Sequence, residues 1–349
     1  MRKLISILLV VLLLTGCLNN PQTERSVLRI YSPSVYIDEN IITDFEDIFN
    51  VKVIYEEFES NEQMYTKLLS GNNYDVLVPS DYMIDRLIQE DQLQKIDMDY
   101  ITNFDYIKEE LLYQDYDLKN EYSIPYFFGS VGILYNKNEV SKKDLEVEGW
   151  NIFLDTKYKN DIYFYDSERD AFMIALKALG YSMNTSNLDE INNAYEWLVK
   201  MADTMSPVYV LDTVIESMLD GNKAMAVMYS GDASFIMSEN EDMEFFMPKE
   251  GTNIWTDAMV ITKDAENVEM ANEWINYLLD FDVALANSIE VGYSSPVKDV
   301  YDEISGVDGD YYEISAYTPR LDYDKDEEFI HNEILRKAIS DLWIKVKAK

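Results

Sequence analysis

The sequence predicts an α/β fold with a parallel sheet, built in about two domains. Apolar runs of strand length alternate with segments of helical period from residue 28 onward. Such a repeated β-α-β order is typical of parallel strands with helices on both faces of the sheet. The chain has 349 residues, of which 47% are hydrophobic, enough for more than one core.

The first third of the chain contains three expected strands and three expected helices. Ser60 has the spacing of a capping box with Gln63, and Gly71 is a typical stop signal for the helix between them. The expected elements are strand 28–31, helix 41–49, strand 51–55, helix 60–71, strand 75–79 and helix 84–88.

A second α/β unit is expected after Pro125. Two of its apolar strands, 129–135 and 257–261, are predicted to cross between the domains. We expect the tyrosine-rich and aspartate-rich stretch 308–317 to be a solvated loop. The other expected elements are strand 162–165, helix 172–179, helix 191–201, strand 207–210, strand 224–228, helix 268–278 and helix 330–346.

Composition excludes several classes of function. Asp and Glu number 66 against 29 Lys and Arg, which gives a formal charge of −37, the wrong sign for a nucleic-acid-binding surface. The single Cys17 and the single His331 argue against a zinc site, a disulfide framework and a Cys–His nucleophile pair. The chain also has no GxxxxGK[ST] and no GxGxxG motif, so no nucleotide cofactor is expected.

The N-terminus predicts export. Met1-Arg2-Lys3 is a basic segment, and residues 4–14 form an apolar run too short for an ordinary membrane-spanning helix. The following Leu14-Thr15-Gly16-Cys17 resembles a bacterial lipobox. This implies a signal peptide over residues 1–16, a lipid on Cys17 and a flexible tether over residues 17–27, anchored to the membrane outside the cytoplasm. The alternative is a buried cysteine at the end of an ordinary signal peptide.

Trp255 and Asp257 are the first candidate binding residues. They are two positions apart at the end of an expected strand, so their side chains share one face. A ring face beside a carboxylate suits an organic cation. The alternative is an exposed aspartate next to a core tryptophan.

Several segments of the chain resemble the spermidine/putrescine-binding proteins of polyamine ABC transporters. The resemblance implies a two-lobed periplasmic-binding-protein fold of type II, with a ligand cleft between lobes joined by a hinge. It places residues 28–133 and 257–301 in the first lobe, and residues 134–256 and 302–349 in the second. The segments that carry it are Ser60–Tyr65, Val78–Tyr82, Tyr122–Tyr126, Trp255–Asp257 and Val291–Pro296.

The resemblance also implies a set of ligand-binding residues. The aromatic members would enclose the methylenes of a polyamine, and the carboxylates would hold its ammonium groups. The set is Ser34, Tyr36, Ser80, Tyr82, Asp166, Asp170, Tyr229, Trp255, Asp257 and Tyr293.

Some positions depart from the pattern of this family. Pro33 and Val35 stand where the family usually has Trp and Glu, and Ser167 replaces an acid. Either Asp166 or Glu168 could supply that carboxylate instead, and Asp81 is an additional acid beside Ser80. Ser167 and Asp170 also have the spacing of a capping box, a structural role that can coexist with ligand contact.

We therefore expect a monomeric, lipid-anchored receptor that captures an extracellular polyamine and delivers it to an ABC permease. No catalysis, cofactor or metal is expected. Three alternatives remain at this point: a binding protein for another small cation or an amino-acid derivative, an extracellular carbohydrate-active enzyme that uses two carboxylates, and a sensory module that binds an amine.

Overall fold

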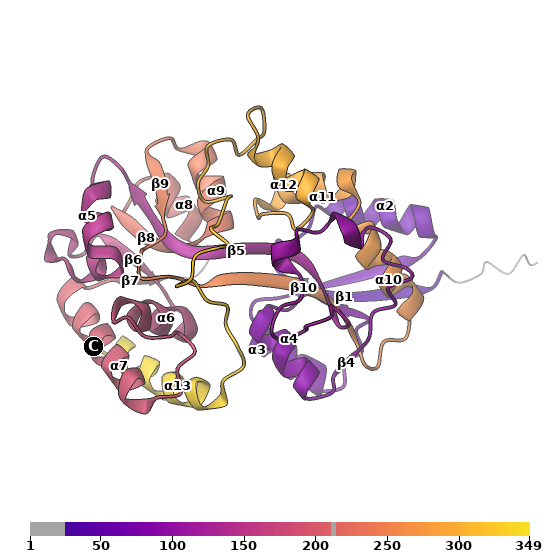
Figure 1. Ribbon diagram of the computed structural model, residues 1–349, viewed down its shortest axis with the longest axis horizontal. Coiled ribbons are helices and arrows are strands. Elements are labelled where there is room, and N and C mark those ends of the chain that lie inside the picture. Colours follow the sequence, from indigo (N-terminus) through magenta and orange to yellow (C-terminus); the bar gives the residue numbers. More distant parts are fainter. Residues whose placement is uncertain (1–24, 211–213) are drawn as a thin grey trace, which may run out of the picture.

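The computed structural model describes residues 25–210 and 214–349, and its centre is one ten-stranded sheet (Figure 1). The strand order is β2-β1-β3-β10-β5-β8-β6-β7, with β4 paired to β10 and β9 paired to β5. The strands are β1 (Val27–Pro33), β2 (Lys52–Phe58), β3 (Val76–Leu77), β4 (Leu93–Gln94), β5 (Ser123–Asn136), β6 (Ile162–Tyr165), β7 (Val208–Val210), β8 (Met225–Tyr229), β9 (Met243–Phe246) and β10 (Ile254–Thr262).

Helices cover both faces of the sheet. They are α2 (Glu39–Phe49), α3 (Asn61–Leu69), α4 (Asp81–Gln89), α5 (Lys142–Glu148), α6 (Glu168–Ala178), α7 (Leu188–Met205), α8 (Val214–Leu219), α9 (Ser230–Glu239), α10 (Val268–Tyr277), α11 (Phe281–Val291), α12 (Lys298–Ser305) and α13 (Glu333–Lys347). Short 3-10 turns lie at Phe104–Tyr106, Glu109–Leu111, Gly149–Leu154 and Thr156–Tyr158.

The elements form two lobes, as expected (Figure 1). The first lobe gathers around β1, β2 and β3, and carries α2, α3, α4, α10, α11 and α12. The second gathers around β6 to β9, and carries α5 to α9 and α13. The strands β5 and β10 pass between the lobes, and the chain that leads into α13 crosses a third time.

The expectation of a parallel sheet holds only for some strands of each lobe, because β8 and β9 are antiparallel to β5 and β4 is antiparallel to β10. β1 pairs in parallel with β2 and β3, and β6 pairs in parallel with β7 and β8. β10 is antiparallel to both β3 and β5. The reason is the path of the chain: it leaves the first lobe along β5 and returns along β10, so the two crossing strands must run in opposite directions.

Local signals in the sequence account for several helix starts. The Ser60 hydroxyl accepts a hydrogen bond from the Gln63 backbone N–H at 3.2 Å, which confirms the predicted cap of α3. The terminal helix begins at Glu333, not at residue 330, because Asn332 is its N-cap and its side chain accepts from the Leu335 N–H.

The expectation of a solvated loop over residues 308–317 is confirmed for the loop and for its exposed acids Asp308, Asp310 and Glu313, but it is wrong for two of its tyrosines. Tyr311 is 6% exposed and Tyr317 is 1% exposed, and their rings stack with centroids 5.1 Å apart. The Tyr317 hydroxyl is satisfied inside the protein, because it lies 2.8 Å from the Ser288 hydroxyl and accepts from the Ser295 N–H. Both rings belong to the core cluster that also contains Leu28 of β1.

The exact lobe boundaries stay a prediction. Tyr317 packs with the core of the first lobe, although it follows the predicted boundary at residue 301. Another apolar cluster continues from Met64 of the first lobe to Phe172 of the second. The two lobes are therefore in contact.

The predicted signal peptide, Cys17 and most of the tether lie outside the described residues. Within the part of the chain that the structure describes, no helix has the length and apolar character needed to span a bilayer.

Candidate functional site

The candidate site lies where β1 and β3 end. Tyr36 follows β1, Ser80 follows β3, and Asp257 lies in the first half of β10. Ser80 and Asp257 form an isolated antiparallel bridge, and the Ala258 N–H donates to the Pro79 carbonyl at 3.1 Å. Because β10 runs against β3, Asp257 comes to the carboxyl end of β3. Ligands of open α/β sheets usually bind at such an end.

Asp257 is a buried carboxylate with one free oxygen. The Tyr36 hydroxyl donates to its Oδ2 at 2.6 Å, whereas its Oδ1 has no hydrogen-bond partner. The residue is 8% exposed, and burial raises the pKa of Asp257 to about 6 against the opposing effects of the nearby Ser80 and Tyr36 hydroxyls. A cation placed at Oδ1 would remove both the unpaired acceptor and the uncompensated charge.

Asp170 is the corresponding carboxylate of the second lobe. It lies in the first turn of α6, where its backbone N–H donates to the Ser167 hydroxyl at 3.3 Å. The capping role predicted for Ser167 is therefore confirmed. The Asp170 side chain is 3% exposed and accepts the Tyr229 hydroxyl at 2.9 Å. Burial raises the pKa of Asp170 above its usual value.

Four aromatic rings run from one carboxylate to the other. The Tyr229 and Trp255 ring centroids are 6.2 Å apart, those of Trp255 and Tyr293 are 5.3 Å apart, and those of Tyr293 and Tyr36 are 5.4 Å apart. All three contacts are edge-to-face, with interplanar angles of 68° to 88°. The run ends at Asp170 through the Tyr229 hydroxyl and at Asp257 through the Tyr36 hydroxyl.

Two glycines make room for these rings. A Cβ on Gly129 of β5 would overlap the Trp255 indole, and a Cβ on Gly231 of α9 would overlap the Tyr293 ring. Gly129 pairs with Trp255 across the two crossing strands. The sequence analysis did not identify either glycine, because the need for them arises only when the rings are in place.

Tyr82 packs against a cation of the opposite lobe. The Arg169 guanidinium of α6 lies 3.5 Å from the Tyr82 ring centroid. Arg169 also forms an ion pair with Glu62 at 3.3 Å, and the Tyr82 hydroxyl donates to the same carboxylate at 3.2 Å. We name Glu62, Tyr82 and Arg169 the interlobe clamp, since these contacts join α3 and α4 to α6.

Three of the expected ligand residues have other partners. Asp166 faces α13, where its Oδ1 accepts the Trp343 indole N–H at 3.1 Å and the Lys347 ammonium at 2.6 Å. Ser34 is exposed and its hydroxyl donates to a backbone carbonyl of β2 at 3.4 Å. The Ser80 hydroxyl accepts the Asn61 amide at 3.0 Å, although its backbone lies beside Asp257.

Two further acids lie outside the expected set of ligand residues: Asp81, which directly follows Ser80, and Glu328. Asp81 is fully buried, and its Oδ1 accepts the Tyr82 N–H at 2.6 Å while its Oδ2 has no partner. Glu328 lies in the third crossing segment, and burial raises its pKa to about 7. The sequence showed Asp81 as an additional acid beside Ser80, but nothing in the sequence singled out Glu328.

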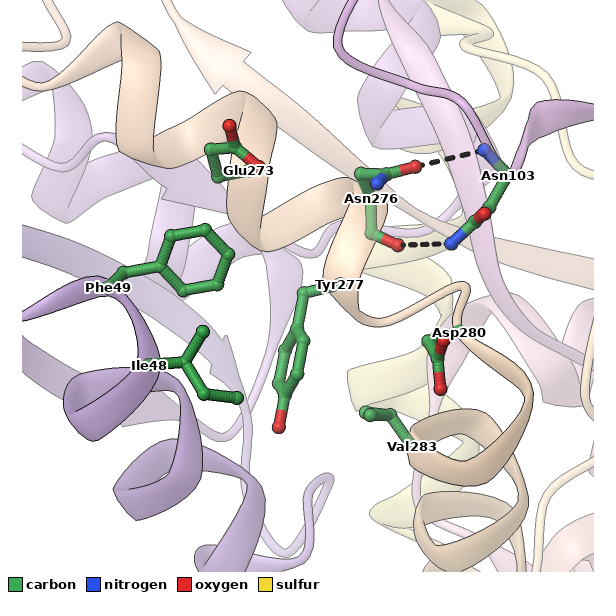
Figure 2. Close-up of a pocket in the computed structure, with 8 residues that line it drawn as sticks. All are labelled: Ile48, Phe49, Asn103, Glu273, Asn276, Tyr277, Asp280 and Val283. Atoms are coloured by element: carbon green, nitrogen blue, oxygen red, sulfur yellow. Dashed lines mark hydrogen bonds between the residues drawn. The ribbon is translucent and has the colours of Figure 1, made fainter.

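A separate pocket lies elsewhere and differs in chemistry from the candidate site (Figure 2). It has a volume of about 400 Å³, and Ile48 and Phe49 of α2 face Tyr277 of α10 across it. The side-chain oxygen of Asn276 in its wall is already paired, because it accepts the Asn103 backbone N–H at 3.0 Å. With no buried unpaired carboxylate in its wall, this pocket offers no counterpart to the Asp257 site. Over the described ranges, no three Asp, Glu, His or Cys side chains are grouped as metal ligands would be.

Comparison with known proteins identifies the family. Residues 40–311 match the model of the bacterial extracellular solute-binding protein family. A spermidine/putrescine-binding periplasmic protein of Salmonella typhimurium is 33% identical over 276 residues, which cover 78% of each chain. The protein of the same name from Escherichia coli K12 is 33% identical over 275 residues, again 78% of each.

Solved structures agree with this match. A structure described as a putative spermidine/putrescine ABC transporter from Listeria monocytogenes superimposes with a TM-score of 0.83 at 34% identity, over 92% of this chain and 99% of that one. The spermidine/putrescine ABC transporter substrate-binding protein of Streptococcus pneumoniae superimposes with a TM-score of 0.79 at 33% identity, over 93% and 99%. The chain belongs to the bacterial extracellular solute-binding proteins.

Proposed function

We propose that this solute-binding protein captures a polyamine between its lobes and hands it to an ABC permease. The observation that carries the proposal is the pair of buried carboxylates, Asp257 and Asp170, joined by a run of aromatic rings. The names of the relatives from Salmonella typhimurium and Streptococcus pneumoniae, which refer to spermidine and putrescine, support the same class of ligand. A family of solute-binding proteins also argues against the alternative of a carbohydrate-active enzyme.

The charges of the site favour a cation over other solutes. Throughout residues 25–210 and 214–349, no Lys or Arg forms an ion pair with Asp257 or Asp170. A buried carboxylate without a cationic partner is costly. An anion or a neutral sugar would leave this cost in place, whereas an ammonium group at each end would remove it. The ring faces between the acids suit the methylenes and the positive charge of an alkylamine.

The expected affinity follows from these contacts. Charge-assisted hydrogen bonds to two carboxylates contribute about 1.5–3 kcal/mol each. Ring contacts with a cation add about 0.5–2 kcal/mol each. At the upper end of these ranges, two such bonds and three ring contacts sum to about 12 kcal/mol. After about 4 kcal/mol of association and ordering costs, this leaves a binding free energy near −8 kcal/mol, or a dissociation constant of about 1 μM.

The ligand roles that we assign differ between the expected residues. Asp257 and Asp170 would hold the two ends of the amine, and Trp255, Tyr229 and Tyr293 would line its path. Tyr36 would orient Asp257 through its hydroxyl. Ser34, Ser80, Tyr82 and Asp166 are left out of direct contact, because each has another partner in the fold.

Attachment to the membrane and delivery are also part of the proposal. The lipobox-like segment before Cys17 supports a lipid anchor outside the cytoplasm, and the family supports a role beside a permease. We propose that the protein acts as a monomer. Labelling with an azide-bearing fatty acid, compared between the wild type and Cys17→Ser, tests the anchor; equal labelling would contradict it.

Calorimetry tests the ligand class. Putrescine and spermidine are titrated into the exported chain, beside an amino acid and a sugar as controls. We expect micromolar binding of at least one amine and no heat from the controls. Asp170→Asn should weaken amine binding, whereas Asp166→Asn, which removes an equal charge four residues away, should not. Binding of the sugar or the amino acid in place of both amines would refute the proposal.

A further inference from the structure

Asn253 is a buried polar residue that the site described so far does not use. It directly precedes β10, so it lies two positions before Trp255 and four before Asp257. Because side chains alternate along a strand, these three residues share one face. Asn253 is 2% exposed, and its Oδ1 has no hydrogen-bond partner among residues 25–210 and 214–349. A buried acceptor without a donor is costly, so this oxygen indicates a place for a donor of the ligand.

The pairing of the strands places Asn253 at the second-lobe end of the site. The Val131 N–H of β5 donates to the Asn253 carbonyl at 3.0 Å, and Val131 in turn pairs with Tyr229 of β8. Residues that pair across a sheet direct their side chains to the same face. Asn253 therefore lies in one row with Tyr229, whose hydroxyl donates to Asp170 at 2.9 Å.

A neighbour on the other side of Asn253 supports the same direction for its side chain. Away from β5, Asn253 forms an isolated parallel bridge with Glu327. The Glu327 carboxylate turns toward α6, where it pairs with the Lys177 ammonium at 3.0 Å. The Asn253 side chain belongs to the same row and so faces α6, the helix whose first turn carries Asp170.

We propose that Asn253 is a further ligand-binding residue, and that its Oδ1 accepts a hydrogen bond from the ammonium group that Asp170 holds. The inference rests on the proposed function and adds a neutral acceptor to the second-lobe end of the site. A primary ammonium has three N–H bonds, so it can donate to Asp170 and to Asn253 at once. Asp257 is four residues along the strand, about 13 Å away at about 3.3 Å per residue. The Asn253 amide therefore serves the opposite end of the amine.

Asn253→Leu tests this role, because leucine keeps the size of the side chain and removes the acceptor. Calorimetry with putrescine at pH 7.5 should show an affinity about 10- to 100-fold weaker than that of the wild type. The empty variant should melt no lower than the wild type, since leucine leaves no acceptor unpaired. Thr256→Val is the matched control and should bind like the wild type. The Thr256 hydroxyl is also buried without a partner in the described part of the chain, but it lies on the opposite face of β10.

Double variants show which end of the amine Asn253 contacts. In an Asp170→Asn background, Asn253→Leu should weaken putrescine binding by less than about threefold more, because both residues hold the same ammonium group. In an Asp257→Asn background, Asn253→Leu should still weaken binding by about 10- to 100-fold, because Asp257 holds the other ammonium group and the two sites are far apart.

The outcomes separate this inference from the proposed function. If Asn253→Leu binds putrescine as tightly as the wild type does, the role of Asn253 is overturned and the proposed function stands. A weaker affinity together with a much lower melting temperature would show a structural role for Asn253 and would also overturn the inference. Equal losses in the Asp170→Asn and Asp257→Asn backgrounds would do the same. Failure of the wild type to bind putrescine or spermidine would overturn both the inference and the proposed function.

Discussion

Replacing Asp257 by asparagine should separate ligand binding from stability. In the ligand-free protein, burial raises the pKa of Asp257 to about 6, whereas an aspartate in an unfolded chain has a pKa of about 4. The folded state holds this proton more tightly than the unfolded chain. Below about pH 4 the group is protonated in both states, so it does not lower the free energy of unfolding. The cost grows as the pH rises and is complete above about pH 6. Two pKa units correspond to about 3 kcal/mol.

The asparagine of the variant would not carry this charge, so the cost disappears. Its amide group would be left partly unpaired, at about 1–3 kcal/mol. The empty Asp257→Asn protein should therefore be as stable as the wild type, or up to about 2 kcal/mol more stable, at pH 7.5. Its amine affinity should fall by about 2–5 kcal/mol, because one ammonium of the ligand loses its buried partner.

Thermal melting with and without spermidine measures both effects in one assay. A ligand at about 1,000 times its dissociation constant stabilises the wild type by about 4 kcal/mol. The variant should lose most of this gain and melt no lower than the wild type when empty. The control is Asp166→Asn, whose carboxylate is paired with Lys347 on α13. The reasoning would be refuted if spermidine stabilised Asp257→Asn as much as it stabilises the wild type. A much lower melting temperature of the empty variant would also refute it.

Three further results are expected. Amine affinity should rise from pH 5 to about pH 7.5, since the Asp257 carboxyl, with a pKa of about 6, must lose its proton to hold an ammonium; a flat calorimetric profile would contradict this. Gly129→Ala should weaken amine binding by about 1–3 kcal/mol, because its Cβ displaces the Trp255 ring, and unchanged tryptophan fluorescence would argue against it. Arg169→Leu should remove the contacts of the interlobe clamp, which contribute about 1–2 kcal/mol to the association of the lobes. X-ray scattering should then show a larger radius of gyration. Arg169→Lys is the control, because it keeps the ion pair with Glu62.

Much of the fold could be predicted from local patterns. Strand β6 has the predicted bounds, and the helices α2, α3, α6, α7 and α10 lie where apolar residues recur at helical spacing. The direction of β10 could not be predicted in this way. It depends on the direction in which the chain passes between the lobes, and periodicity within a segment has no information on that direction. The same holds for Tyr311 and Tyr317, whose burial requires contacts with Ser288 and the first-lobe core.

The candidate site, like the fold, could be predicted only in part from the sequence. Trp255 and Asp257 could be paired by the two-residue period of a strand, and the structure places both beside Tyr36 and Tyr293. Asp166 could not be separated from Asp170 by sequence, because residues between a strand and a helix have no fixed side-chain direction. Its partner Lys347 is 181 positions away.

The distribution of acids between the lobes also explains why capture of a ligand would favour the closed arrangement. A ligand shifts a conformational equilibrium only by its difference in affinity for the two states. Tyr36 holds Asp257 from the first lobe, and α6 carries Asp170 in the second. A cation that contacts only one of these two carboxylates binds equally well to the open and the closed state. An amine long enough to reach both gains its second charge-assisted bond only on closure, about 1.5–3 kcal/mol, and a shift of that size changes the ratio of closed to open protein by about 10- to 100-fold.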